Sequence, residues 1–189
     1  MARGDHGVRG GPARGDRREG ACARWRRSPL PPRRGRHRPL RNWPQAVRDA
    51  GFDPRTPTVW LIEGLLQYLD ETAVGTLFAR IDALSAPASV LLYDVVGKTL
   101  LEAPFMAGLR QSMAEQGSPW LFATDTPGAP AEAHGWSAAV TDVAEPGHRW
   151  GRWQAPVVPA DVPDAPRGYF VEAVKTPISE IKKMSSGQL

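Results

Sequence analysis

The 189-residue sequence lacks several features that would point to a particular class of protein. Its single cysteine, Cys22, excludes an internal disulfide bond and any site built from several thiolates. No apolar run is long enough to cross a bilayer. The arginine-containing first residues also lack the apolar stretch of a secretory signal. We therefore expect a cytoplasmic protein with no membrane partner.

Two familiar kinds of catalytic site are missing as well. No Gly-x-Ser-x-Gly nucleophile elbow occurs in the sequence, which argues against an α/β serine hydrolase. Of the four histidines, His134 and His148 stand at no recognised ligand spacing with Asp142. The other two lie in the arginine-rich first part of the chain. We predict no metal site.

The net charge of +4 conceals two parts of different composition. Residues 1–41 contain thirteen Arg and three acidic residues, a net charge of +10, and no Lys, Ile, Phe or Tyr. The other 148 residues carry 11 basic and 17 acidic groups, a net charge of −6. That acidic balance argues against a nucleic-acid or anionic-membrane surface on the second part.

We expect residues 1–41 to be a disordered Arg/Gly/Pro-rich extension. Their composition offers too little apolar area to offset backbone entropy of roughly 1–2 kcal/mol per residue. Two other interpretations stay open. The segment could be an arginine-rich arm for phosphate backbones, with Trp25 as a stacking residue. It could also be a sequence read outside its native frame, because GC-rich codons then yield this mixture.

The remaining chain is organised around residues 57–69, an apolar run that stops at one carboxylate. Five consecutive apolar or β-branched residues, 58–62, predict a strand buried on both faces, which belongs in the middle of a parallel sheet. Ligands bind beyond the carboxyl ends of such strands, so Glu63 is expected where a ligand would lie, and Gly64 leaves room for its close approach. The simpler alternative, that Glu63 only begins a loop, stays open.

Further elements are predicted from the period of apolar residues and from residues that begin or end helices. A helix over 71–84 is capped by Asp70 and buries Val74, Leu77, Phe78, Ile81 and Leu84 on one face, as the crossover of a βαβ unit. A helix over about 98–116 is expected to kink or begin at Pro104 and to pack on the sheet. The other predicted elements are a short helix at 44–50, strands at 89–95, 137–143 and 168–174, and a Pro-rich loop at 155–166.

Several short stretches resemble one protein family. They are Trp43-Pro44, Ala50-Gly51-Phe52-Asp53, Pro57-Thr58-Val59-Trp60-Leu61, Glu63-Gly64-Leu65-Leu66, Tyr68-Leu69 and Leu84-Ser85-Ala86-Pro87, and the likeness extends to about Lys175. Together they resemble the leucine carboxyl methyltransferase-like bacterial O-methyltransferases, which are class I S-adenosylmethionine-dependent methyltransferases. The resemblance implies an α/β, Rossmann-like methyltransferase fold. Residues 42–175 would form the C-terminal half of its sheet with flanking helices, and 176–189 a tail.

The resemblance also implies roles for three residues at the cofactor. Glu63 would lie beside the methionyl end of S-adenosylmethionine, where a carboxylate can pair with the ammonium group, and Gly64 would lie next to it. Leu40 matches the family's Asp-Leu-Arg pattern, in which Pro39 here replaces the Asp. That replacement removes an acidic group from the adenine end and also a backbone donor.

The substrate side is implied by the resemblance alone. It places Tyr68 and Leu69 there, although Tyr68 fits a core position slightly better. No catalytic residue is assigned, because a carboxylate acceptor needs no base. Asp94 lies at the end of the second predicted strand. We interpret it as a strand-end turn residue in preference to a catalytic residue.

The predicted function is O-methyl transfer from S-adenosylmethionine to a small-molecule carboxylate or hydroxyl. The alternatives are an inactive methyltransferase remnant and, less favoured, a nucleic-acid binder that uses the arginine-rich arm. The family's strand and glycine-rich turn have no match in residues 1–41, so we expect weak cofactor binding or none. In the family's sheet order the strand at 58–63 would lie beside that strand. Its edge is therefore expected to be open and prone to self-association.

Overall fold

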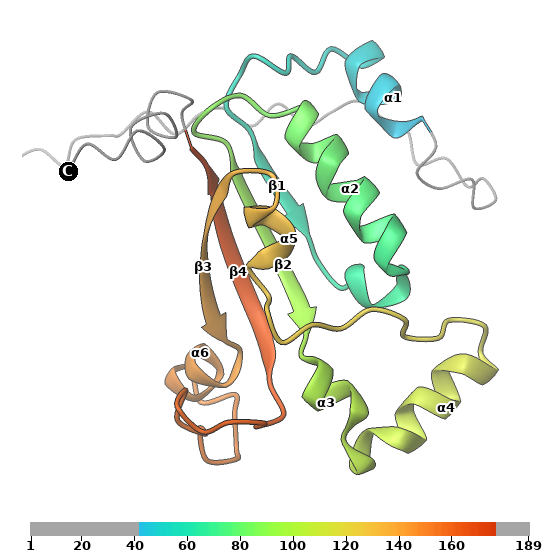
Figure 1. The fold of residues 1–189 in the computed structure, drawn as a ribbon, viewed down its shortest axis with the longest axis vertical. Helices are drawn as coiled ribbons and strands as arrows, with labels where there is room; N and C mark the ends of the chain where they lie inside the picture. The colour runs from blue at the N-terminus through green and yellow to red at the C-terminus, as the bar shows by residue number, and fades with distance from the viewer. Residues whose placement is uncertain (1–41, 177–189) are drawn as a thin grey trace, which may run out of the picture. The chain divides into compact units, whose positions relative to one another are not determined.

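The computed structural model describes residues 42–176, so the predictions for residues 1–41, Leu40 among them, and for 177–189 lie outside the described residues. The described residues belong to one compact unit (Figure 1). In chain order its elements are α1 (Trp43–Asp49), β1 (Val59–Ile62), the 3₁₀ turn η1 (Leu66–Tyr68), α2 (Glu71–Ala83), β2 (Val90–Val96), α3 (Lys98–Glu102), η2 (Pro104–Met106), α4 (Ala107–Glu115), α5 (Ala129–Glu132), β3 (Trp136–Asp142), α6 (Ala144–Arg149) and β4 (Gly168–Lys175).

Four strands form a single mixed sheet in the order β1-β2-β4-β3. β1 and β2 are parallel neighbours, with Val59 opposite Val90 and Ile62 opposite Tyr93. β4 runs antiparallel to β2 on one side and to β3 on the other. The four predicted strands and the parallel pairing of the first two are therefore confirmed. A crossover helix between β1 and β2 explains their parallel pairing.

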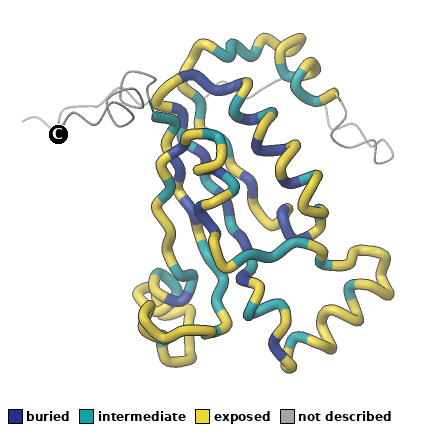
Figure 2. The backbone as a smooth tube through the Cα atoms, in the orientation of Figure 1, coloured by how far each residue is buried: buried dark blue, intermediate teal, exposed yellow. Residues whose placement is uncertain are grey.

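Helix α2 covers one face of this sheet, as its periodicity predicted. The Asp70 carboxylate accepts a hydrogen bond from the Ala73 N–H at 2.7 Å and caps the helix. The buried residues of α2 and of the sheet form one core (Figure 2), with the ring of Phe78 edge-on to that of Tyr93 at 5.2 Å. The core residues are Ile62, Leu66, Val74, Leu77, Phe78, Ile81, Leu91, Tyr93, Val95, Ala131, Trp136, Val171 and Ala173.

The opposite face of β1 is open, which contradicts the prediction of a strand buried on both faces. Val59 is 51% exposed and Leu61 is 66% exposed, while Trp60 and Ile62 point towards the core. Among the described residues, β1 is also the edge of the sheet rather than its middle. An unbroken apolar run shows that both faces of a strand are apolar, but it does not say what covers them.

The predicted helix over 98–116 is interrupted at Pro104. Ala103 has an extended backbone (φ −57°, ψ 139°) because a residue before proline avoids the helical region. The segment therefore divides into α3, η2 and α4. No residue of α4 is buried, and Figure 1 shows this helix projecting away from the sheet. The prediction that the whole helix packs on the sheet is therefore wrong.

Two short helices were not predicted. α5 lies against β3 and α2, and α6 follows β3 directly. Each spans at most six residues, which is too short to show a helical period in the sequence. The Pro-rich passage 155–166 is a loop, as predicted.

Candidate functional site

The carboxyl ends of β1, β2 and β3 lie at the same end of the sheet, because β4 is antiparallel to both β2 and β3. In open α/β sheets, ligands bind beyond these carboxyl ends. β1 ends at Ile62, so Glu63 is the first residue beyond it, and its side chain is exposed. The structure therefore places Glu63 beyond the carboxyl end of its strand, where the sequence predicted it.

Gly64 turns the chain directly after Glu63. Its φ of +59° lies in the left-handed region, which costs residues with a Cβ about 1–2 kcal/mol. A Cβ placed on Gly64 would meet no atom within 4 Å, so the space beside this turn is open. The backbone conformation is what requires glycine here.

Asp94 holds this turn against the second strand. Its Oδ1 accepts a hydrogen bond from the Gly64 N–H at 2.6 Å, across thirty positions of sequence. Sequence reasoning treated Asp94 as a strand-end residue and missed this contact. The signal that could have found it is an acidic residue near the end of each of two adjacent parallel strands, since such ends meet at the same edge.

Two grooves meet at Glu63. The first, of about 430 Å³, follows the open edge of β1 and is lined by Trp43, Trp60, Leu61, Ile62, Glu63, Gly64, Leu65, Leu77 and Ile81. The second, of about 440 Å³, lies on the open face of the sheet and is lined by Leu61, Ile62, Glu63, Leu92, Tyr93, Asp94, Ala139, Thr141, Phe170, Val171 and Glu172. This second hollow, which we call the open-face groove, combines an apolar floor with three carboxylates. Among the described residues that line it, none is basic.

A third groove, of about 540 Å³, lies between α2, α3 and the segment 121–130. Lys98 and Glu102 stand at its rim and form an exposed ion pair of 3.9 Å. None of the residues predicted for the cofactor or the substrate lines this groove. We therefore place the candidate site at Glu63.

Tyr68 and Leu69 follow the Glu63 turn through η1. The exposed ring of Tyr68 meets Trp120 edge-on at 6.4 Å, whereas Leu69 packs partly buried against the core. The buried Gln67, which sequence reasoning passed over, accepts a backbone hydrogen bond from the Leu121 N–H at 2.6 Å and ties the 117–128 loop to η1. The substrate-side assignment of Tyr68 and Leu69 stays a prediction.

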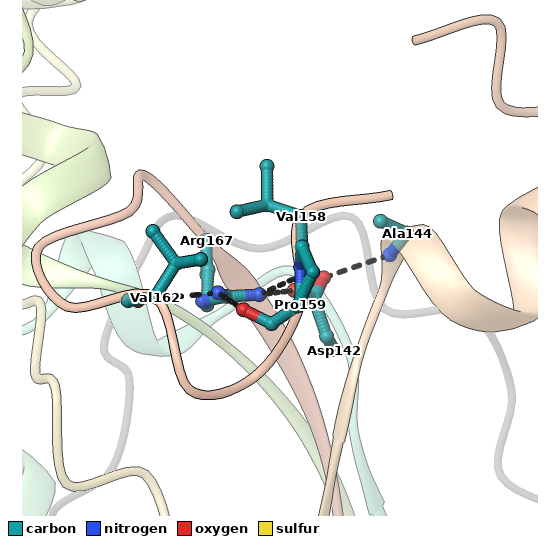
Figure 3. A network of polar contacts seen from close by, with 6 residues as sticks. All are labelled: Asp142, Ala144, Val158, Pro159, Val162 and Arg167. Atoms are coloured by element: carbon teal, nitrogen blue, oxygen red, sulfur yellow. Dashed lines mark hydrogen bonds and ion pairs between the residues drawn. The ribbon is translucent and has the colours of Figure 1, made fainter. Parts of the chain in front are cut away.

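Also at the carboxyl ends of the strands, Arg167 joins the end of β3 to the Pro-rich loop (Figure 3). Its guanidinium donates to Asp142 Oδ2 at 2.6 Å and to the carbonyl oxygen of Val158 at 2.8 Å, and it also donates to that of Pro159. The other oxygen of Asp142 accepts from the Ala144 N–H at 2.9 Å. The side chains of Arg167 and Asp142 are only 9% and 12% exposed, so this pair is part of the scaffold beside the site.

Between residues 42 and 176, no group of three or more His, Cys, Asp or Glu side chains is arranged to hold a metal ion. Within the same range, no helix has the length and apolarity needed to span a bilayer.

Known proteins resemble this chain over part of their length. Residues 36–82 match the family model of leucine carboxyl methyltransferase. A protein of Mycobacterium sp. (strain KMS), named "Putative S-adenosyl-L-methionine-dependent methyltransferase", is 37% identical over 142 residues, which are 71% of this chain and 44% of that protein. A Mycobacterium tuberculosis protein of the same name (strain H37Ra) is 47% identical over 72 residues, or 38% of this chain and 23% of that one.

The chain thus spans less than half the length of these relatives. Among solved structures, a DUF574 family protein from Streptomyces avermitilis superposes with a TM-score of 0.49 at 18% identity, covering 71% of this chain and 52% of that one. By its sequence, this chain resembles part of the leucine carboxyl methyltransferase-like family of class I S-adenosylmethionine-dependent methyltransferases.

Proposed function

We propose that this chain belongs to an enzyme that methylates a small-molecule carboxylate or hydroxyl oxygen with S-adenosylmethionine, and that Glu63 holds the methionyl end of the cofactor. The observation that carries this proposal is the exposed Glu63 carboxylate at the carboxyl end of β1, next to a glycine turn and an acidic, apolar groove. S-adenosylmethionine carries positive charge on its sulfonium and ammonium groups. Carboxylates around an apolar floor suit such a ligand.

The described residues fit only part of this cofactor. Its carboxylate needs donors, and its ribose hydroxyls need partners of their own, yet the described residues lining the two grooves at Glu63 include no basic side chain. The fit is therefore to the cationic end. A charge-assisted hydrogen bond contributes about 1.5–3 kcal/mol, whereas a micromolar site needs about 8 kcal/mol. We expect the chain by itself to bind S-adenosylmethionine weakly or not at all.

Within this proposal the chain positions groups and excludes water. Bound S-adenosylmethionine supplies the methyl group for an in-line displacement. Asp94 fixes the Gly64 turn, and through it the direction in which Glu63 points. Tyr68 and Leu69 form the wall for the acceptor. No base is assigned, since an ionised carboxylate acceptor has no proton to lose. A hydroxyl acceptor would release its proton to solvent water.

The proposal is tested by NMR on the isotope-labelled 189-residue chain, titrated with S-adenosylmethionine into the millimolar range. We expect the amide resonances of Glu63 and Gly64 to shift, and the shifts to disappear in Glu63→Gln. Glu115→Gln, an exposed carboxylate on α4, is the matched control and should respond like the wild type. Shifts confined to the groove between α2 and α3 would contradict the proposed site.

Two further outcomes separate the alternatives. If saturating cofactor shifts no resonance, the chain is an inactive remnant of its family. A calorimetric Kd in the micromolar range or tighter, lost in Glu63→Ala, would instead overturn the expectation of weak binding. The nucleic-acid alternative rests on residues 1–41, outside the described residues. This alternative predicts that a short oligonucleotide shifts the amide resonances of residues 1–41 only.

A further inference from the structure

Two buried polar atoms beside the predicted acceptor wall have no hydrogen-bond partner among the described residues. They are the side-chain oxygen Oε1 of Gln67 and the indole Nε1 of Trp120. Gln67 is only 8% exposed and lies in η1 next to Tyr68, and the ring of Trp120 meets that of Tyr68 edge-on at 6.4 Å. Neither residue lines the two grooves that meet at Glu63, so this pair does not follow from the uncovered sides of β1.

An unpaired buried polar atom is costly to keep. Folding removes water from such an atom and returns no bond in exchange, which is why nearly all buried polar groups in proteins are paired. Gln67 already serves the fold through its backbone, because its carbonyl oxygen accepts from the N–H groups of Leu121 at 2.6 Å and Phe122 at 3.3 Å. Its side-chain oxygen takes no part in that tie. A cost that the fold does not need points to a ligand.

The chemistry of the two atoms limits the ligand group that fits them. Gln67 Oε1 can only accept a hydrogen bond, and the Trp120 indole N–H can only donate one. A hydroxyl does both and therefore satisfies the pair. An ionised carboxylate only accepts, and it would place its charge against Gln67 Oε1. An ammonium group only donates, and it would leave Trp120 unpaired.

We propose that Gln67 and Trp120 bind the acceptor of the methyl transfer and that this acceptor is a hydroxyl rather than a carboxylate, an inference that rests on the proposed function. The hydroxyl donates to Gln67 Oε1, and its oxygen accepts from the Trp120 indole N–H. Gln67 orients the hydroxyl and takes no proton, since an amide is not a base at neutral pH. Transfer forms the O–CH₃ bond, breaks the S–CH₃ bond and releases the hydroxyl proton to solvent water.

The segment that carries Trp120 has to move for the acceptor to enter, because both polar atoms are enclosed. Residues 118–124 contain no helix or strand, and at Gln67 this segment is held by two N–H groups that share one carbonyl oxygen. Leu121 and Phe122, which follow Trp120, line the groove of about 540 Å³ between α2 and α3. That volume is typical of small-molecule sites and gives room for the apolar body of the acceptor.

Methylation removes the O–H group on which this recognition depends. The ether product leaves Gln67 Oε1 unpaired again, and a site built to bind a hydroxyl rejects the analogue that lacks it. The pair therefore favours the unmethylated acceptor over its product.

Phenol and its methyl ether, anisole, test the proposal by NMR on the labelled 189-residue chain. Phenol, titrated into the millimolar range, should shift the side-chain amide resonances of Gln67 and the indole resonance of Trp120. The preference for phenol over anisole should fall about two- to tenfold in Gln67→Met, which is the range of one hydrogen bond. Gln111→Met, at an exposed glutamine of α4, is the matched control and should keep the preference. Trp120→Phe should weaken both probes alike.

Urea unfolding gives a second measurement, which a purely structural role would reverse. Gln67→Met removes an unpaired buried atom, so it should raise the unfolding midpoint while it weakens phenol binding. A lower midpoint would show that the amide supports the fold and would overturn the proposal. Phenol that leaves both side-chain resonances unchanged, or benzoate that binds more tightly than phenol, would overturn it as well. No cofactor is added, so these results are separate from the test of S-adenosylmethionine binding at Glu63.

Discussion

Removal of the Arg167 guanidinium should destabilise the protein strongly, although Arg167 lies in a loop. Arg167→Met keeps the apolar stem but leaves the Asp142 carboxylate, which is only 12% exposed, without its cation. It also leaves the carbonyl oxygens of Val158 and Pro159 without this donor. Breaking a buried ion pair from one side costs about 3–5 kcal/mol. We expect the lower end, about 3 kcal/mol, because the Pro-rich loop can open and admit water.

Asp142→Asn tests the same contact from the other side. The amide oxygen can still accept from the Ala144 N–H, and Arg167 keeps its carbonyl partners, so the expected cost is smaller, about 1.5–3 kcal/mol. Urea unfolding followed by tryptophan fluorescence measures both costs. The double variant should show a coupling of about 1 kcal/mol or more, since the two residues share one network.

The matched control is Arg55→Met. Arg55 pairs with Asp53 at 3.0 Å, but both side chains are well exposed, and this substitution should leave the unfolding midpoint unchanged. A cost below about 1 kcal/mol for Arg167→Met, or additive effects in the double variant, would refute the conclusion that this network is a structural anchor.

Two other predictions concern backbone conformation and pH. Gly64→Ala should destabilise the fold by about 1–2 kcal/mol, because Gly64 has a positive φ. Gly75 is exposed within α2 with open space around it, so Gly75→Ala should stabilise the fold by about 0.5–1 kcal/mol. Equal effects of the two substitutions in urea unfolding would contradict the backbone argument. Burial raises the pKa of Tyr93 above its ordinary 10.0. The stabilisation that depends on the neutral Tyr93 phenol is therefore complete below pH 10. It is lost as the pH rises further, by up to about 1.4 kcal/mol per pH unit. Tyr93→Phe, which also loses the hydrogen bond to the Pro127 carbonyl, should show a shallower loss above pH 10; identical pH slopes would count against the burial argument.

Local patterns were enough to predict most of the described fold. The helix that begins at Asp70 follows from a capping residue and an apolar period, and both act within a few turns of chain. The four strands and the parallel pairing of β1 with β2 followed from short apolar runs combined with the resemblance to the family. Pro104 was recognised as a break, although its consequence, a helix α4 that leaves the sheet, was not.

The candidate site was predictable only in part. Glu63 could be placed at the carboxyl end of its strand because it is the first charged residue after an unbroken apolar run. Its role at a cofactor, like those of Leu40, Gly64, Tyr68 and Leu69, stays a prediction. Acidic residues near the ends of two adjacent parallel strands indicate that Asp94 and Glu63 lie close together, but the hydrogen bond from Gly64 to Asp94 depends on the exact height at which β1 and β2 pair.

The sequence by itself determined the four strands, helix α2 and which residues of α2 face inwards, because those properties depend on neighbours a few positions away. Only the tertiary structure decided that, among residues 42–176, nothing covers one face and one edge of β1. It also decided that Asp94 meets Gly64 and Arg167 meets Asp142, across thirty and twenty-five positions respectively. An apolar side chain is compatible with burial on either side of a strand. Which side is covered depends on the distant segments that pack there, and no local pattern contains that information.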